Sequence, residues 1–167
     1  GLCIVICPES KPIEFNQTLA TYAAWQVDDN KHINCSSGGV ASALYEVFLQ
    51  SGGWAAGVFS SENFEPKFKL TNKSSDLERF KGSKYVQVDT GDIYNQVYRK
   101  ILEGQKVVFI GLPCHCAAMK QRANGVADDH LLLVDMVCHG VPAFRTLESH
   151  IKSVELKYRK HACSVRY

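Results

Sequence analysis

Two short apolar runs, each ending at a cysteine, place the strongest constraint on the fold of this chain. They are residues 106–116, KVVFIGLPCHC, and residues 131–142, LLLVDMVCHGVP. Each run is rich in Val, Ile, Leu and Phe and then reaches Cys followed by His, Gly or Pro. This pattern is typical of a buried strand that ends in a loop carrying a thiol. If the two strands are parallel neighbours, Cys114 and Cys138 emerge at the same sheet edge, where open α/β sheets bind ligands.

Strand and helix patterns alternate along the rest of the chain. We predict strands at residues 19–27, 54–59, 67–71, 107–110 and 131–137, and helices after the NCSSGG of residues 34–39 and at residues 92–103, 116–123 and 142–158. Ser36 or Ser37 is a candidate cap of the first of these helices, and Gly52 with Gly53 stops it. The alternation predicts an α/β fold, with a mostly parallel or mixed sheet flanked by helices.

Composition excludes several classes of protein. With 167 residues, of which 46% are hydrophobic, the chain suits one compact domain or one domain plus a fragment. The 19 basic and 17 acidic residues give a formal charge of +2 and form no runs, so nucleic acid and anionic membrane are poor partners. No apolar run approaches the ~20 residues of a membrane span. The start lacks the order of a signal peptide, and we therefore expect a soluble, cytoplasmic protein.

The seven cysteines are odd in number and follow no secretory signal, so metal or redox use is the better interpretation than a disulfide framework. At the start, Cys3-Ile4-Val5-Ile6-Cys7-Pro8 reproduces the last half of the bacterial ferredoxin pattern C-x2-C-x2-C-x3-C-P. The alternative is a pair of ordinary buried cysteines beside a proline. On the first reading, residues 1–16 are the C-terminal half of a ferredoxin-like 4Fe-4S motif plus a linker, and residues 17–167 form the α/β domain.

Two glycine-containing segments could bind an anion. Residues 35–39, CSSGG, sit at a predicted helix start, where free N–H groups attract a phosphate and glycine lets the backbone approach it. Residues 82–85, GSKY, could add a cation and hydroxyls to the same pocket. The alternatives are a well-capped helix whose glycines pack on a strand, and an ordinary turn.

The strand-end cysteines allow three kinds of chemistry. Cys114 and Cys138 could hold an iron–sulfur cluster, or could bind zinc together with a histidine such as His139. One cysteine could instead be a nucleophile with a histidine as its base. Inert buried cysteines are the remaining alternative. We interpret Cys116 and Cys163 as packing residues.

The chain resembles the beta-subunit family of the coenzyme F420 hydrogenases and dehydrogenases, which are iron–sulfur flavoproteins. Five motifs carry the resemblance, in order along the chain: CIVICP at residues 3–8, SSGG at 36–39, RFKGSKYVQ at 79–87, GLPC at 111–114 and CHGVP at 138–142. Leu112, His115 and Cys116 stand where the family usually has Thr, Gln and an aliphatic residue, which leaves the use of a deazaflavin open.

The resemblance implies cofactor ligands. Cys3 and Cys7 match the third and fourth ligands of an N-terminal 4Fe-4S motif. Cys114 and Cys138 match the motif cysteines that we assign to a second cluster, with its remaining pair expected in a C-x2-C beyond Tyr167. The flavin (FAD) would be bound by two segments: Ser36, Ser37, Gly38 and Gly39 as the phosphate loop, and Ser83, Lys84 and Tyr85 in the same pocket.

The function that the resemblance implies is that of an electron-transferring oxidoreductase. It would pass electrons between 4Fe-4S clusters and FAD and on to a deazaflavin, a ferredoxin or another acceptor. We expect a redox partner protein or subunit such as ferredoxin or hydrogenase, and no activity from these 167 residues alone. A zinc-stabilised Cys/His binding module and a Cys–His hydrolase remain the alternatives.

Overall fold

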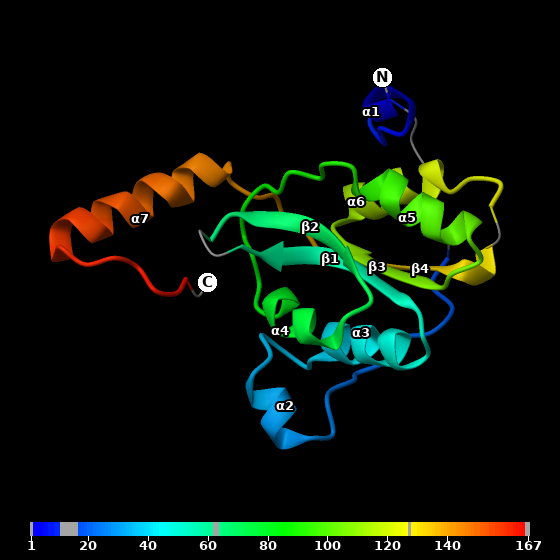
Figure 1. Cartoon of the computed structure of the whole chain (residues 1–167), viewed down its shortest axis with the longest axis horizontal. Coiled ribbons are helices and arrows are strands. Elements are labelled where there is room, and N and C mark those ends of the chain that lie inside the picture. The colour runs from blue at the N-terminus through cyan, green and yellow to red at the C-terminus, as the bar shows by residue number, and fades with distance from the viewer. Residues whose placement is uncertain (1, 11–16, 62–63, 127, 166–167) are drawn as a thin grey trace.

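A four-stranded mixed sheet is the centre of the computed structural model, which describes residues 2–10, 17–61, 64–126 and 128–165 (Figure 1). The strands are β1 (Trp54–Ser60), β2 (Pro66–Thr71), β3 (Val107–Gly111) and β4 (Leu131–Asp135), in the order β2-β1-β3-β4. β1 and β2 pair antiparallel, whereas β1 with β3 and β3 with β4 pair parallel. The predicted α/β fold with a mixed sheet flanked by helices is confirmed.

Helices cover both faces of this sheet. The helices of the described residues are α1 Leu2–Val5, α2 Asp29–Ile33, α3 Val40–Gln50, α4 Leu77–Phe80, α5 Ile93–Leu102, α6 Pro113–Arg122 and α7 Phe144–Tyr158, with 3-10 turns at Ser74–Asp76 and Asp128–His130. Figure 1 shows α3 and α4 on one side of the sheet and α5 and α6 on the other. The same view shows α7 extending away from the sheet.

Alternating residues of β3 supply two separate cores. Val107 and Phe109 pack with Ile93 and Val97 of α5 and with Met119 of α6. The other β3 side chains alternate with these and face the opposite way. Burial on both faces explains why β3 reads as a continuous apolar run rather than as an alternating one.

The second core lies between the sheet and helices α3 and α4. Val108 and Ile110 of β3 pack there with Tyr45 of α3 and Phe80 of α4. The rings of Tyr45 and Phe80 are 5.2 Å apart between centroids and are tilted by 55°. These contacts fix α3 and α4 against the sheet, and with them the loops at their ends.

The predicted strand at residues 19–27 is wrong. No regular secondary structure is present in this segment, and Leu19 is 99% exposed and Trp25 65% exposed. Its apolar and aromatic composition favours a strand, but a strand also needs a neighbouring edge with which to pair. Here Gln26 N–H donates to the Gly38 carbonyl at 2.8 Å, which ties the segment to a loop and not to the sheet.

Three helix starts also differ from the prediction. α6 begins at Pro113, three residues earlier than expected, because proline at the first helical position has its φ preset and loses no hydrogen bond. α3 has Gly39 as its N-cap, with φ of 77° and no side-chain cap, so neither Ser36 nor Ser37 caps it. α7 begins at Phe144, two residues after Pro142.

We predict that Gly57→Ala lowers the free energy of unfolding by about 1–3 kcal/mol, the usual cost of overpacking. A Cβ at Gly57 would overlap the Tyr45 hydroxyl, which donates to the Ala56 carbonyl at 3.4 Å. Urea denaturation of Gly57→Ala, Tyr45→Phe and the double variant measures the effect. The double variant should lose less stability than the two single losses added together; strict additivity would contradict the overlap.

A polar cluster fixes the turn that follows β2. Thr71 is only 4% exposed, and its hydroxyl donates to Asp76, which also accepts from Lys69 Nζ at 2.9 Å. These bonds, first from Thr71 and then from Lys69, lower the pKa of the Asp76 carboxyl. The ionised carboxylate therefore stabilises the connection between β2 and α4.

We predict that this stabilisation disappears in acid. Because the folded-state pKa of Asp76 is depressed, its contribution is complete above the ordinary Asp pKa of about 3.9 and is lost as the pH falls through the lower folded value. Asp76→Asn should destabilise the chain at about pH 7, and the difference from the unsubstituted chain should shrink below about pH 4. Denaturant titrations at both pH values test this, and a difference independent of pH would contradict it.

Candidate cofactor site

The end of β3 and the first turn of α6 form one compact corner. A Cβ on Gly111 would lie 3.0 Å from His115 Cβ, so glycine lets the helix start directly over the strand end. The Leu112 N–H donates to His115 Nδ1 at 3.3 Å, and the His115 ring stands edge-on to Phe68 at 5.0 Å. Burial lowers the pKa of the His115 imidazole. Cys114 is therefore placed in a helix turn and not in a free loop.

The parallel register brings the two strand-end motifs to one edge. Gly111 of β3 pairs with Asp135 of β4, and the Met136 N–H donates to the Gly111 carbonyl at 2.9 Å. Cys114 follows Gly111 by three residues, and Cys138 follows Asp135 by the same number. The expectation that the two strands are parallel neighbours is confirmed, and both cysteines follow carboxyl ends at the same edge of the sheet.

The cysteines of these motifs differ in environment. Cys114 and Cys138 are free and exposed, and the Gly140 N–H donates to Cys138 Sγ at 3.3 Å. Cys116 is buried and its thiol donates to the Val134 carbonyl at 3.4 Å. Burial first, and then the charge of Asp135, raise the pKa of Cys116 to about 12. Cys116 is therefore a packing residue, whereas the thiols of Cys114 and Cys138 are accessible.

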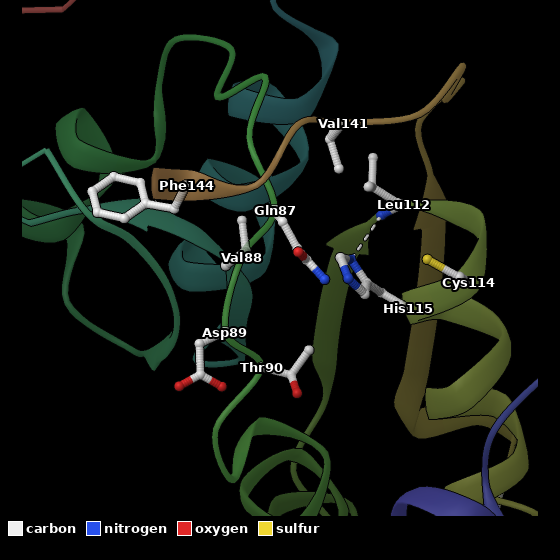
Figure 2. A pocket seen from close by; sticks show the side chains of 9 residues that line it. All are labelled: Gln87, Val88, Asp89, Thr90, Leu112, Cys114, His115, Val141 and Phe144. Carbon is white, nitrogen blue, oxygen red and sulfur yellow. Dashed lines mark hydrogen bonds between the residues drawn. The ribbon is translucent and has the colours of Figure 1, made fainter. Parts of the chain in front are cut away.

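A pocket of about 710 Å³ lies at this edge (Figure 2). It is lined by Gln87, Val88, Asp89, Thr90, Leu112, Cys114, His115, Val141 and Phe144. The Gln87 N–H donates to the Pro142 carbonyl at 2.8 Å, which joins two of its walls. Gln87 and Val141 are not among the site residues that the sequence predicts, although they belong to the RFKGSKYVQ and CHGVP motifs.

The two predicted anion-binding segments meet in space. The Ser83 N–H donates to Ser36 Oγ at 3.2 Å, across 47 positions of sequence. The Lys84 ammonium donates to the Phe80 and Lys81 carbonyls, both at 2.8 Å, and so caps the end of α4. Burial lowers the pKa of Lys84 to about 8. Ser36, Ser37 and Tyr85 are exposed beside this junction.

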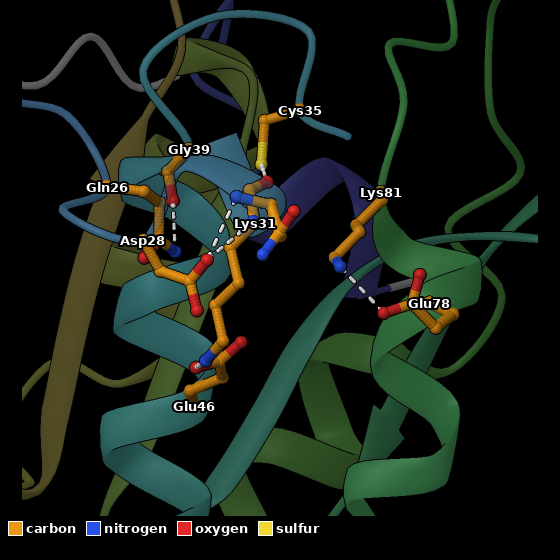
Figure 3. A network of polar contacts seen from close by, with 9 residues as sticks. Gln26, Asp28, Lys31, Cys35, Gly39, Glu46, Glu78 and Lys81 are labelled. Atoms are coloured by element: carbon orange, nitrogen blue, oxygen red, sulfur yellow. Dashed lines mark hydrogen bonds and ion pairs between the residues drawn. The ribbon is translucent and has the colours of Figure 1, made fainter. Parts of the chain in front are cut away.

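Packing within the chain accounts for both glycines of the SSGG motif. A Cβ on Gly38 would lie 2.5 Å from the Ala24 carbonyl oxygen, and one on Gly39 would lie 2.6 Å from Gln26 Cγ. Figure 3 shows the surrounding network, in which Gln26 Nε2 donates to the Gly39 carbonyl at 3.3 Å and Cys35 Sγ donates to the Lys31 carbonyl at 3.1 Å. The glycines thus shape the loop by allowing this close packing.

The N-terminal cysteines lie in and after α1. Cys7 is half-buried, and hydrogen bonds from the backbone of Ser10 and then Glu9 lower the pKa of its thiol. A lowered pKa favours the thiolate, which is the metal-binding form. The side chain of Cys3, the predicted neighbouring ligand, lies outside the described part of the structure.

Within the described residues, no three His, Cys, Asp or Glu side chains gather closely enough to hold a metal ion. Cys114, Cys138 and His139, the set required for a zinc site, are therefore not assembled as one. The described part of the chain also contains no helix of the length and hydropathy needed to cross a membrane.

Comparison with known proteins matches the chain to a family, to a curated relative and to a solved structure. Residues 104–164 match the family described as the C terminus of the coenzyme F420 hydrogenase/dehydrogenase beta subunit. The chain is 23% identical over 138 residues to a subunit of the F(420)H(2) dehydrogenase of Methanosarcina mazei, covering 81% of this chain and 39% of that protein. It superposes with a TM-score of 0.62 and 18% identity on a chain of the F420-reducing NiFe hydrogenase complex from Methanosarcina barkeri, covering 80% of this chain and 50% of that one.

The fold and its edge define an α/β domain that presents two accessible thiols beside a pocket at the carboxyl ends of parallel strands. The family match includes both Cys114 and Cys138. The comparisons support the coenzyme F420 hydrogenase/dehydrogenase beta-subunit family, which the motifs also indicate, through the match of residues 104–164 to its C-terminal part. It spans 39% of the length of the curated relative and 50% of the solved chain.

We predict that alkylation separates the cysteines. In metal-free native protein at about pH 8, iodoacetamide should modify Cys114 and Cys138, whereas Cys116 should react only after urea is added, because its buried thiol stays protonated. Exposed Cys163 is the internal control for reagent access. Peptide mass spectrometry over time measures the rates, and equal rates at Cys114 and Cys116 in native protein would contradict the assignment.

Proposed function

We propose that this chain is the cofactor-bearing part of an electron-transferring iron–sulfur flavoprotein oxidoreductase. The observation that carries the proposal is the register of β3 and β4, which sets Cys114 and Cys138 at equivalent positions after two adjacent parallel strands. The family match over residues 104–164 and the electron-transfer relatives support it.

The chemistry of the thiols fits half of a cluster ligand set. A 4Fe-4S cluster is held by four thiolates, and Cys114 and Cys138 supply two accessible ones. An amide donating to Cys138 Sγ stabilises negative charge on a ligand sulfur and tunes its potential. The other two ligands are expected beyond Tyr167. Cys3 and Cys7 are assigned to a separate N-terminal cluster in the segment of residues 1–16.

The junction of the SSGG and GSKY motifs fits the phosphate end of a flavin. Ser36 and Ser37 offer exposed hydroxyls at the start of α3, and the bond from Ser83 to Ser36 holds the second segment beside them. Lys84 fixes that segment to α4, while Gly38 and Gly39 let the loop pack closely against residues 24–26. A bound flavin would supply exchange of an electron pair or a hydride for single electrons. The protein supplies its position.

The relatives support a redox partner protein. The matched proteins are named as part of an F420H2 dehydrogenase and as part of an F420-reducing hydrogenase complex. We assign this chain a redox partner protein, such as a hydrogenase component or a ferredoxin. A deazaflavin, a ferredoxin or another carrier is the acceptor.

We predict that the full-length protein that contains this chain is yellow-brown when purified anaerobically and holds iron, acid-labile sulfide and flavin. Cys114→Ser and Cys138→Ser should each remove about four iron atoms, the content of one cluster. The variant Cys163→Ser should keep its iron, since we assign this exposed thiol no ligand role. Elemental analysis, sulfide assay and flavin absorbance measure the outcome.

Three results would overturn the proposal. Reconstituted protein without iron or flavin would exclude it, and zinc without iron would favour the binding module. An activity abolished by Cys114→Ser but indifferent to metal and flavin removal would favour the hydrolase.

A further inference from the structure

The segment of residues 17–27 contains one residue that is not exposed, Gln26. The other residues of the segment are exposed, among them Trp25 at 65% and Val27 at 95%, whereas Gln26 is half-buried. This arrangement is the reverse of the usual one, in which polar side chains face water and apolar ones are covered. Specific bonds therefore hold Gln26 in place, and they lead to the SSGG loop.

Gln26 bonds to both glycines of that loop. Its N–H donates to the Gly38 carbonyl at 2.8 Å, and its side-chain Nε2 donates to the Gly39 carbonyl at 3.3 Å, as Figure 3 shows for the second bond. The Gly39 carbonyl also accepts from the Ala43 N–H at 3.1 Å, the bond with which α3 begins. The side chain of Gln26 thus holds the residue from which α3 starts.

These bonds close a loop that runs from residue 26 to residue 39. Inside it, Asp28 caps α2, and Cys35 Sγ donates to the Lys31 carbonyl at 3.1 Å. Compact surface loops whose ends are held together in this way are frequently functional. The closure by Gln26 sets the SSGG motif, the last part of the loop, at the start of α3.

Gln26 bonds to carbonyl groups and does not use the N–H groups of the motif. A helix is usually capped by Ser, Thr, Asn or Asp, whose side-chain oxygen accepts from the N–H groups of the first turn. Gly39 has no side chain, and α3 has no side-chain cap. The N–H groups of its first turn therefore stay available to an anion. Gln26 fixes the helix start without occupying these donors.

We infer that Gln26 is a positioning residue of the anion-binding loop at residues 36–39, which it holds in the geometry that receives a phosphate. The inference rests on the proposed function, in which this loop binds the phosphate of the flavin. Gln26 acts through the backbone of the loop. Ser83 supplies a second, independent bond, from its N–H to Ser36 Oγ at 3.2 Å.

Binding of riboflavin and of FMN to the full-length protein, freed of flavin, tests the inference. These two ligands differ only in the phosphate, so the ratio of their dissociation constants measures what the phosphate contributes. Gln26→Met keeps the length of the side chain and removes the Nε2 donor. It should weaken FMN binding about fivefold, the effect of one hydrogen bond of ordinary strength, and leave riboflavin binding unchanged. Fluorescence titration measures both constants.

Two further variants serve as controls. Gln50→Met, at the exposed other end of α3, should change neither constant. Gly38→Ala attacks the same contact from the loop, since its Cβ would lie 2.5 Å from the Ala24 carbonyl oxygen. It should weaken FMN binding selectively, as Gln26→Met does. The double variant should lose little more than the larger single loss, because both changes disrupt one contact.

The outcomes separate the inference from the proposed function. Equal weakening of riboflavin and FMN binding by Gln26→Met would overturn the inference, since it would reveal a general effect on the fold. If the unsubstituted protein prefers FMN, unchanged FMN binding in Gln26→Met and in Gly38→Ala would overturn the inference and leave the proposed function standing. Unsubstituted protein that binds neither ligand, or both equally, would overturn the inference together with the phosphate assignment on which it rests.

Discussion

The parallel pairing of β3 with β4 is the constraint on which the rest of the site depends. β3 is buried on both faces, so its position is fixed by two cores, and its five residues pair in register with the five of β4. A shift of one residue would turn every side chain of a strand to the other face. The burial of Phe109 and Val108 on opposite faces therefore also fixes where Cys114 and Cys138 emerge.

The first turn of α6 gives two neighbouring cysteines different environments. Cys114 and Cys116 are two residues apart, and one is exposed while the other is buried against the Val134 carbonyl. Pro113 starts the helix early and Gly111 allows the close approach of His115. Two thiols that look alike in sequence thereby have different reactivity, because burial keeps the Cys116 proton in place near neutral pH.

The segment of residues 82–90 joins the two parts of the candidate site. At one end the Ser83 N–H bonds to Ser36, and at the other the Gln87 N–H bonds to the Pro142 carbonyl. Lys84 fixes the segment to α4, which packs on the sheet. Apart from an isolated β-bridge between Asp89 and Lys67 it has no regular secondary structure, so individual hydrogen bonds hold these groups in place.

The sequence by itself determined the α/β class, the strand ends that carry Cys114 and Cys138, and the family resemblance, because local apolar patterns and short motifs specify these. It could not show that residues 19–27 stay unpaired, since strand formation depends on an available edge far away in the chain. Only the tertiary structure decided that Ser36 meets Ser83, that Gln87 and His115 share a pocket, and that Cys116 is buried. These facts depend on contacts between distant segments, which no local pattern encodes.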